Sequence, residues 1–346
     1  MQQLLIRTMQ QHEMDAWDAY VDQHSQGSFF HLSGWQRIAR EVFGHTPHYL
    51  VALDHDAIVG VLPLVEQKSR LFGHALISTP FCVYGGILSN DESIREALED
   101  KSVELGHQLG VDFVELRDRY AAEIRAPWQI HCKHVTIGCD IAESPDAILA
   151  GVKKKQRAVL RHSMKNELSF SVTPDADTCY DIYAESVRNL GTPVFTDKLF
   201  SALMDVFPER SETLVVRNKE QKAVSAVLSF YYKNQVLPYY GGGLFEARGL
   251  KSNDYMYYQL MCHAQTKGCD YFDFGRSKLD SGSYKYKKHW GMPEQTLHYR
   301  FALIKADALP NLSPNNPKYK LLINTWQKLP VFISRMIGPM ISKYLG

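Results

Sequence analysis

An internal repeat constrains the fold of this chain more than any other feature. Tyr84-Gly85-Gly86 in the first half matches Tyr240-Gly241-Gly242 in the second. The segment GVDFVEL (110–116) likewise matches GCDYFDF (268–274). From glycine to glycine the two motifs lie 24 positions apart in the first half and 26 in the second. This near-equal strand–helix–strand spacing predicts a duplicated α/β unit; the alternative is a chance likeness between two α/β halves.

The element pattern agrees with two lobes. Apolar runs bounded by polar turns predict strands, and longer amphipathic stretches predict helices. The expected strands are 2–8, 49–53, 58–65, 111–117, 135–141, 213–217, 223–232, 236–243, 269–275 and 297–304. The expected helices are 13–23, 34–43, one capped by Ser89 or Asn90 and ending near 109, a long one after 145, and 252–267. We therefore predict a first lobe over 1–145, a second over 146–306 and a tail over 307–346.

Composition excludes several classes of protein. The 346 residues are enough for two domains, and the net charge of +1 implies no particular partner. None of the six cysteines forms a C-x-x-C motif, and the histidines show no metal-binding spacing, so we predict free thiols and no metal site. The first residues lack the apolar core of a signal peptide, and no apolar run reaches about 18 residues. We therefore expect a cytoplasmic protein.

The stretch from Cys269 to Arg300 is the densest in unusual residues. A short strand, 271–274, ends at Gly275 and is followed by a polar loop to Gly282. A basic and aromatic run then extends over 284–290. A rigid strand that presents a loop of Lys, Arg and Tyr is a common way to build an anion or sugar site. The alternative is a solvated basic loop over core aromatics.

Two further basic segments stand out. Arg157 and Arg161 are four residues apart on the helix expected after 145, so they share one face, beside an apolar row. This face could contact a polyanion or simply be solvated. After Asp307 the chain has no acidic residue, and its tail is basic, apolar and interrupted by prolines. The tail could lie at an anionic membrane surface or pack across the first lobe, and we favour packing slightly.

Several of these segments together resemble a known family. They are FDFGRSK (272–278), GSYKYKKHWG (282–291), LHYRF (297–301), GVLPLVEQKSRLFG (60–73), PFCVYGG (80–86), SVRNLGTPVF (186–195) and LPYYGGG (237–243). They resemble the FemAB-like proteins found with exosortase and PEP-CTERM loci, in the Fem-type and BioF2-like branch of the GNAT acyltransferase superfamily. The resemblance covers about residues 25–305. It implies an α/β (α+β) fold of two tandem GNAT-like lobes, mixed sheets flanked by helices, before the C-terminal helical tail.

The resemblance also implies where an acyl donor would bind. In the GNAT fold two adjacent parallel strands separate in mid-sheet and the acyl carrier enters the gap; the matching strands here are 236–243 and 270–275. Gly241 and Gly242 would suit a bulge and close approach of a ligand, or else form a simple glycine turn. The coenzyme A loop would fall on the segment that holds Arg248 and Asn253, but its second glycine is absent. The donor is therefore either aminoacyl-tRNA or acyl-CoA, with no tightly bound cofactor.

The expected reaction is attack by an amine on an activated acyl carbon. We predict that Asp273 orients or deprotonates the amine, unless its role is structural, and that Arg276 binds phosphate or stabilises the oxyanion. Tyr240 completes the catalytic set and, with Trp290, lines the acceptor pocket. The predicted substrate-binding residues are Lys278, Tyr284, Lys285, Lys287, Trp290, Asn189, Arg157 and Arg161; Asn189 belongs to a second polar loop that could close over the site.

The expected function is transfer of an acyl or aminoacyl group to an amine of a cell-envelope precursor. The resemblance implies a role in exopolysaccharide synthesis, because the family's genes are found with exosortase and PEP-CTERM loci. Synthesis of a peptidoglycan-like polymer is the alternative. The expected partners are an amino-sugar or peptide-bearing precursor, tRNA if it is the donor, and the inner membrane surface through the tail. Two other functions stay open: an acyl-CoA-dependent N-acetyltransferase, and a non-catalytic GNAT scaffold that binds a glycan precursor.

Overall fold

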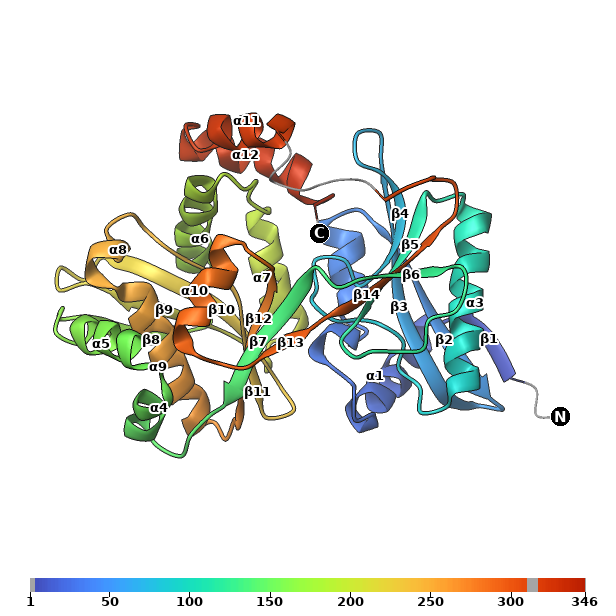
Figure 1. Cartoon of the computed structure of the whole chain (residues 1–346), viewed down its shortest axis with the longest axis horizontal. Helices are drawn as coiled ribbons and strands as arrows, with labels where there is room; N and C mark the ends of the chain where they lie inside the picture. Colours follow the sequence, from blue (N-terminus) through green and yellow to red (C-terminus); the bar gives the residue numbers. More distant parts are fainter. Residues whose placement is uncertain (1–3, 310–316, 346) are drawn as a thin grey trace. The chain divides into compact units, whose positions relative to one another are not determined.

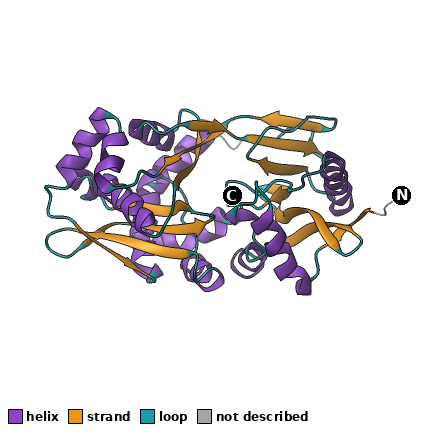
Figure 2. Cartoon of the chain, turned by 90° about the horizontal axis from the view of Figure 1, so that it is seen from below, coloured by secondary structure: helices purple, strands orange, loops and turns teal. Residues whose placement is uncertain are grey.

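A computed structural model describes residues 4–309 and 317–345, and the chain divides into two compact units (Figure 1). Unit 1 comprises residues 1–134, 296–310 and 344–346, and unit 2 comprises 135–295 and 311–343. Each unit holds one seven-stranded sheet with helices packed beside it (Figure 2). The predicted mixture of sheets and flanking helices in two lobes is confirmed.

The sheet of unit 1 is built mostly from antiparallel neighbours. Its strands lie in the order β1 (Leu4–Thr8), β2 (Thr46–Asp54), β3 (Ala57–Ser69), β4 (Gly73–Ser78), β5 (Phe113–Asp118), β14 (His298–Leu303) and β6 (Trp128–His131). The pair β4–β5 is parallel and is connected through α3 (Glu92–Leu109). Helix α3 begins at Asp91, whose carboxylate accepts hydrogen bonds from the backbone N–H groups of Ser93 and Ile94. The predicted cap at Ser89 or Asn90 was therefore wrong by one or two positions.

The sheet of unit 2 repeats this plan. Its strands lie in the order β13 (Glu294–Thr296), β7 (His134–Asp140), β12 (Tyr271–Lys278), β11 (Gln235–Gly243), β10 (Ala223–Tyr232), β9 (Ser211–Arg217) and β8 (Ser169–Thr173). The pair β11–β12 is parallel and is connected through α9 (Ser252–Thr266). The order β2-β3-β4-α3-β5 thus recurs as β9-β10-β11-α9-β12, as the duplicated motifs predict.

The two units exchange one strand each. Strand β7 follows β6 of unit 1 in the sequence but lies beside β12 in unit 2. Strand β14 follows the strands of unit 2 but pairs with β5 and β6 in unit 1. The predicted lobe limits at 145 and 306 therefore differ from the structural division near 134 and 295. Sequence order does not reveal such an exchange, because each strand pairs with residues more than 130 positions away.

The remaining helices lie in the connections between strands, except α11 and α12, which follow the last strand. They are α1 (Met14–Gln23), α2 (Trp35–Arg37, continued by a π-helical turn over 38–42), α4 (Pro145–Gly151), α5 (Lys154–Ser163), α6 (Ala176–Leu190), α7 (Asp197–Val206), α8 (Ala247–Leu250), α10 (Gly282–Trp290), α11 (Pro317–Trp326) and α12 (Val331–Ser342). The long helix predicted after 145 is two helices, because Val152 has an extended backbone. In the region that the structure describes, none of these helices is long and apolar enough to cross a membrane.

The tail packs on unit 2 rather than on the first lobe. Helix α12 lies against α6 (Figure 1). An ion pair of 2.7 Å joins Arg335 of α12 to Asp181 of α6. Tyr344, beyond α12, contacts His45 of unit 1, with ring centroids 5.6 Å apart. The predicted packing on the first lobe is thus seen at Tyr344, whereas α12 packs on unit 2. Residues 310–316, close to the start of the predicted tail (307–346), lie outside the described residues.

Candidate active site

The candidate site lies where the parallel strands β11 and β12 separate. They pair at Gln235–Tyr271 and Val236–Phe272. On its other side β11 stays paired with β10, but its register shifts so that Tyr239 is an extra residue between Pro238 and Tyr240. A bulge of this kind turns backbone N–H and C=O groups away from regular pairing. The sheet of unit 2 therefore opens beside a bulged strand, and β12 continues past the opening to Lys278.

A kink in β12 marks the opened part of the strand. Gly275 has a positive φ of +77°, so the strand bends there and continues to Lys278. The prediction that the strand ends at Gly275 was therefore wrong. The Asp273 carboxylate stabilises the bend, since its Oδ1 accepts the N–H of Gly275 at 2.9 Å and the hydroxyl of Thr136 at 3.0 Å. Asp273 is almost fully buried. These contacts give it a structural role, and its action as a base stays a prediction.

The basic and aromatic run after β12 forms a helix, α10. The Ser281 hydroxyl caps it by accepting the N–H of Tyr284 at 3.2 Å, and Gly291 ends it in the left-handed conformation. Tyr286 and Trp290, four residues apart, face the core of unit 2, while Lys285 points to solvent. The helix was not predicted, although its cap residues were visible in the sequence.

Lys287 extends from α10 to the opened part of β12. Its ammonium donates to the carbonyl oxygens of Gly275 at 3.0 Å and Arg276 at 3.1 Å, and lies 5.2 Å from the centre of the Phe274 ring. Burial lowers the pKa of Lys287 to about 8, although the nearby Asp273 carboxylate opposes this shift. An ammonium has three N–H donors and these carbonyls use two. Lys287 can therefore offer a further donor, or in its neutral form a base, at the strand opening.

The other predicted residues of this segment have varied surroundings. Arg276 lies beside Lys287 and also lowers its pKa. Lys278 is the last residue of β12 and is half-buried. The Tyr284 hydroxyl donates to Glu294 at 3.0 Å. Trp290, predicted to line an acceptor pocket, is buried against Phe274 with ring centroids 5.8 Å apart.

The glycines of β11 make room for protein rather than for a ligand. A side chain at Gly241 would come within 2.9 Å of Val227, and one at Gly242 would overlap Ser186 of α6. A side chain at Gly243, which points to the opposite face, would overlap Asn253 of α9. The two helices can therefore lie close to the strand on its two faces. The bulge predicted at the glycines is at Tyr239 instead.

Tyr240 lies on the α6 face, away from α9. Its ring is within 5.3–5.8 Å of the rings of Tyr183, Phe195 and Phe200. This aromatic cluster is part of the core of unit 2, and Tyr240 is 5% exposed. Its surroundings are those of a packing residue, and its predicted contact with the acceptor stays a prediction.

The residues predicted to hold the donor lie near the start of α9. Arg248, on the short helix α8, is exposed and lies 5.5 Å over the ring of Phe245, which is itself 75% exposed. The Asn253 side chain faces Gly243, and its Oδ1 is buried. The residue before α9, Lys251, has a positive φ of +56°, a conformation that glycine would adopt more readily. Arg248 and Asn253 thus lie in the connection from β11 into α9, and their contact with a donor stays a prediction.

The predicted residues on α5 and α6 have separate environments. The Arg157 guanidinium donates to the carbonyl oxygens of Ala150 at 2.7 Å and Val152 at 3.0 Å, so it caps the end of α4. Arg161 is exposed on α5. Asn189 is half-buried in the last turn of α6, so the polar loop predicted for it was wrong. Arg157 thus has a structural function that helical periodicity could not reveal.

Unit 1 contains a cavity that the sequence did not predict. It has a volume of about 290 Å³ and is lined by Tyr84, Gly85 and Gly86 of the repeat motif, by Arg117 at the end of β5 and by Arg119 just after that strand. The Arg119 guanidinium lies 4.7 Å over the Tyr84 ring. The clustered charges at the end of β5 were a signal in the sequence, because ligands often bind beyond the carboxyl ends of parallel strands.

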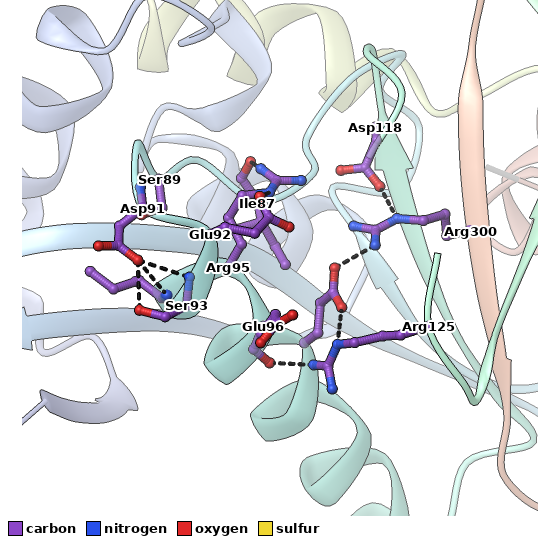
Figure 3. Close-up of polar contacts among 12 residues, drawn as sticks. Ile87, Ser89, Asp91, Glu92, Ser93, Arg95, Glu96, Asp118, Arg125 and Arg300 are labelled. Carbon is purple, nitrogen blue, oxygen red and sulfur yellow. Dashed lines mark hydrogen bonds and ion pairs between the residues drawn. The ribbon is translucent and has the colours of Figure 1, made fainter. Parts of the chain in front are cut away.

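A buried ion network lies at this end of unit 1 (Figure 3). Arg300 of β14 donates to Asp118 at 2.7 Å and also pairs with Glu99 of α3. Glu99 in turn accepts from Arg125 at 3.1 Å, which also donates to the carbonyl oxygen of Glu96 at 2.6 Å. Arg300 is 1% exposed, so its charge is stabilised by these two carboxylates. The network joins the exchanged strand to α3 and to the loop before β6.

Comparisons with known proteins agree with this architecture. Residues 150–288, which include the strand opening and most of α10, match the acetyltransferase (GNAT) domain family. No curated protein sequence matches the chain.

Similar solved structures cover nearly the whole chain. A crystal structure of FemX is 14% identical with a TM-score of 0.68, and the match covers 92% of this chain and all of FemX. A tandem GNAT protein of the clavulanic acid pathway is 11% identical with a TM-score of 0.55, covering 88% and 100%. The C-terminal domain of a putative lysylphosphatidylglycerol synthetase from Agrobacterium fabrum is 12% identical with a TM-score of 0.52, covering 84% and 92%. At these identities the likeness concerns the fold, and it confirms the predicted tandem GNAT-like architecture.

Proposed function

We propose that this protein is an acyltransferase whose second unit transfers an acyl or aminoacyl group to an amine. The observation that carries the proposal is the opening between β11 and β12, with a bulge on one strand and the Lys287 ammonium on the other. An acyl carbonyl placed in such a gap can accept hydrogen bonds from backbone N–H groups and from the lysine. The match of residues 150–288 to a GNAT domain supports the same class of reaction.

The proposed reaction forms one bond and breaks one. The neutral amine of the acceptor attacks the acyl carbon and forms a C–N bond, and the carbonyl oxygen becomes an oxyanion. The oxyanion then collapses and expels the oxygen of a tRNA ester or the sulfur of a coenzyme A thioester. Protonated Lys287 stabilises the oxyanion or gives its proton to the leaving group, and the amine's proton passes to solvent or to the neutral lysine. A pKa of about 8 allows both forms of Lys287 near neutral pH.

We propose aminoacyl-tRNA as the donor. The α5 helix exposes Lys154, Lys155 and Arg161, and in the part of the chain that the structure describes no ion pair joins them to an acid. Such a face suits the phosphates of a nucleic acid. The exposed Phe245 beside Arg248 would suit stacking of an unpaired base. The alternative donor is acyl-CoA, for which the start of α9 would have to bind the pyrophosphate without its second glycine.

The proposed acceptor is an amine on a cell-envelope precursor, in exopolysaccharide or peptidoglycan-like synthesis. The resemblance to FemAB-like proteins suggests this class, and a fold shared with a lysylphosphatidylglycerol synthetase domain is consistent with aminoacyl transfer. The proposed partners are this precursor, tRNA and an anionic membrane surface, which would place the protein in the cytoplasm at the inner membrane.

A second candidate function is binding of a glycan precursor without turnover. The cavity of unit 1 favours it, because its volume suits a sugar or nucleotide and its lining presents Arg95, Arg117 and Arg119. Catalysis and binding are not exclusive, since one unit could bind what the other modifies.

Transfer assays with isotope-labelled donors test the proposal. Purified protein is given charged tRNA or acetyl-CoA with amino sugars and nucleotide-sugar precursors, and thermal shifts are measured in parallel. A ligand at 100 times its dissociation constant stabilises the fold by about 2.7 kcal/mol, which is readily detected. Transfer from charged tRNA is the expected result. Transfer from acetyl-CoA and not from charged tRNA would identify acyl-CoA as the donor instead. Binding of nucleotide sugars with no transfer from either donor would favour the second function, binding of a glycan precursor without turnover.

A further inference from the structure

Helix α12 presents its large apolar side chains to solvent. Phe332, Met336 and Met340 recur every four residues and are 71%, 68% and 68% exposed. A spacing of four keeps side chains on one face of a helix, so the three form a continuous ridge about 12 Å long. We refer to these three residues as the α12 ridge. In an ordinary surface helix side chains of this kind face the core.

The opposite face of α12 carries small residues and packs on unit 2. Ser334, Gly338 and Ser342 also recur every four residues and are buried. A side chain at Gly338 would come within 2.8 Å of the carbonyl oxygen of Val194, so the glycine allows close contact. The ion pair between Arg335 and Asp181 fixes the same orientation. The α12 ridge is therefore directed outward by packing on its other side.

The charges of the tail favour an anionic partner for the ridge. Lys328 precedes the helix and Lys343 follows it. After Asp307 the sequence has five Lys and Arg residues and no Asp or Glu. A second copy of this chain would bring the same positive charges to the same place. Three side chains also offer at most roughly 500 Å², below the about 800 Å² that each partner buries in a stable interface.

We propose that the α12 ridge inserts into the surface of an anionic lipid bilayer. Phe332, Met336 and Met340 would enter the boundary between headgroups and acyl chains, while Lys328 and Lys343 stay with the lipid phosphates. This membrane contact is separate from acyl transfer and does not depend on it. The α12 ridge would be the docking face of the tail, and it would hold unit 2 at a membrane surface.

Vesicle sedimentation with the full chain tests this proposal. The probes are vesicles of phosphatidylcholine alone and vesicles that also contain phosphatidylglycerol. We expect binding to the anionic vesicles that weakens as salt is added, because screening reduces the attraction of the lysines. The combined variant Phe332→Ser, Met336→Ser and Met340→Ser should lower the partition coefficient by about 100-fold or more.

Two further variants make the result specific. Phe245→Ser removes another phenylalanine of similar exposure from unit 2 and should leave vesicle binding unchanged. Phe332→Trp should retain it, because tryptophan favours the membrane interface. Equal binding by the triple variant and the natural protein would overturn the proposal, as would absence of binding to anionic vesicles. A dimer that the triple variant abolishes, with no vesicle binding, would identify a second copy as the occupant instead.

Discussion

Arg117 and Gly275 occupy the same position in the two copies of the repeat, and their difference separates the two units. They are 158 residues apart, as are the matching glycines 110 and 268. In unit 1, the Arg117 side chain is buried and donates to Glu115 at 2.9 Å and to the carbonyl oxygen of Cys82 at 2.9 Å. In unit 2, Gly275 has no side chain, and the nearest atom to a Cβ there would be Lys287 Nζ at 3.9 Å.

The same strand separation is thus closed in one unit and left open in the other. Beyond the β4–β5 pair, the Ser78 hydroxyl accepts the N–H of Arg117 at 2.7 Å and so bridges the two strands. Beyond the β11–β12 pair, the carbonyls of β12 accept from the Lys287 ammonium instead. The acid of the repeat is ion-paired in unit 1 as Glu115, but in unit 2, as Asp273, it accepts from the neutral Thr136 hydroxyl and Gly275 N–H. Unit 1 uses this position for stability, and we assign the chemistry to unit 2.

The largest effect is expected from Arg300→Met. This change leaves Asp118 without its buried partner and Glu99 with Arg125 alone, so the free energy of unfolding should fall by about 3–5 kcal/mol. Because β14 belongs to unit 1, hydrogen exchange should increase in β5 and β6 while unit 2 stays protected. Arg125→Met changes the partly exposed end of the network and should lower the free energy of unfolding by less than Arg300→Met does. Faster exchange confined to unit 2 would contradict the strand exchange.

Lys287→Met should abolish most transfer activity with little change in ligand binding to unit 1. Loss of a donor to an oxyanion lowers turnover by about 10²–10³-fold. The matched control is Lys288→Met on the same helix, which removes an exposed ion pair with Glu294 and should keep near-normal turnover. Equal rates for the two variants would remove Lys287 from the reaction.

The lowered pKa of Lys287 also predicts how stability depends on pH. The lysine releases its proton near pH 8 in the folded protein but only near pH 10.5 when unfolded. Between these values the unfolded chain holds one more proton, so raising the pH stabilises the natural protein relative to Lys287→Met, by about 1.4 kcal/mol for each unit of lowered pKa. Below pH 8 the difference between the two proteins should be constant. Denaturant titrations of both proteins from pH 7 to about 10.5 measure this difference. If the free energies of unfolding of the two proteins change with pH in parallel, the pKa of Lys287 is not lowered.

The sequence predicted the parts of the fold that depend on local pattern. Helix α9 and strand β11 begin and end within about two residues of their predicted limits, because apolar periodicity and glycine positions are local signals. The repeat predicted two lobes for the same reason. The exchange of β7 and β14 is a pairing of distant segments, and nothing in the order of elements indicates it.

The location of the candidate site was predicted in part. Lys287 and the opening after the β11–β12 pair lie in segments that the sequence singled out. The neighbours that decide each residue's role were not visible: Gly242 faces Ser186, and Arg157 caps α4. Helix α10 was missed although Ser281 and Gly291 are standard cap residues, since the density of lysine and tyrosine suggested a loop.

Ser78→Ala tests whether the gap in unit 1 is held closed. The substitution leaves the buried N–H of Arg117 without its acceptor, which should lower the free energy of unfolding by about 2 kcal/mol. Thermal unfolding and hydrogen exchange at the end of β5 measure the effect. Transfer activity of unit 2 should remain close to normal, so loss of activity at unchanged stability would contradict the division of roles.

Gly275→Ala should have the smallest effect on stability, but it tests the comparison between Arg117 and Gly275 most directly. The added methyl group meets no atom closer than 3.9 Å, so crowding is absent, but its φ of +77° strains any residue other than glycine. The strain should exceed the gain from a stiffer unfolded chain and lower stability by about 1 kcal/mol. If the kink positions the carbonyls that hold Lys287, transfer should fall more than stability does. Gly275→Arg, which restores the residue of unit 1, should then fill the opening and stop transfer while the chain still folds. Retained turnover in the arginine variant would show that the opening at Gly275 is not where the acyl group reacts.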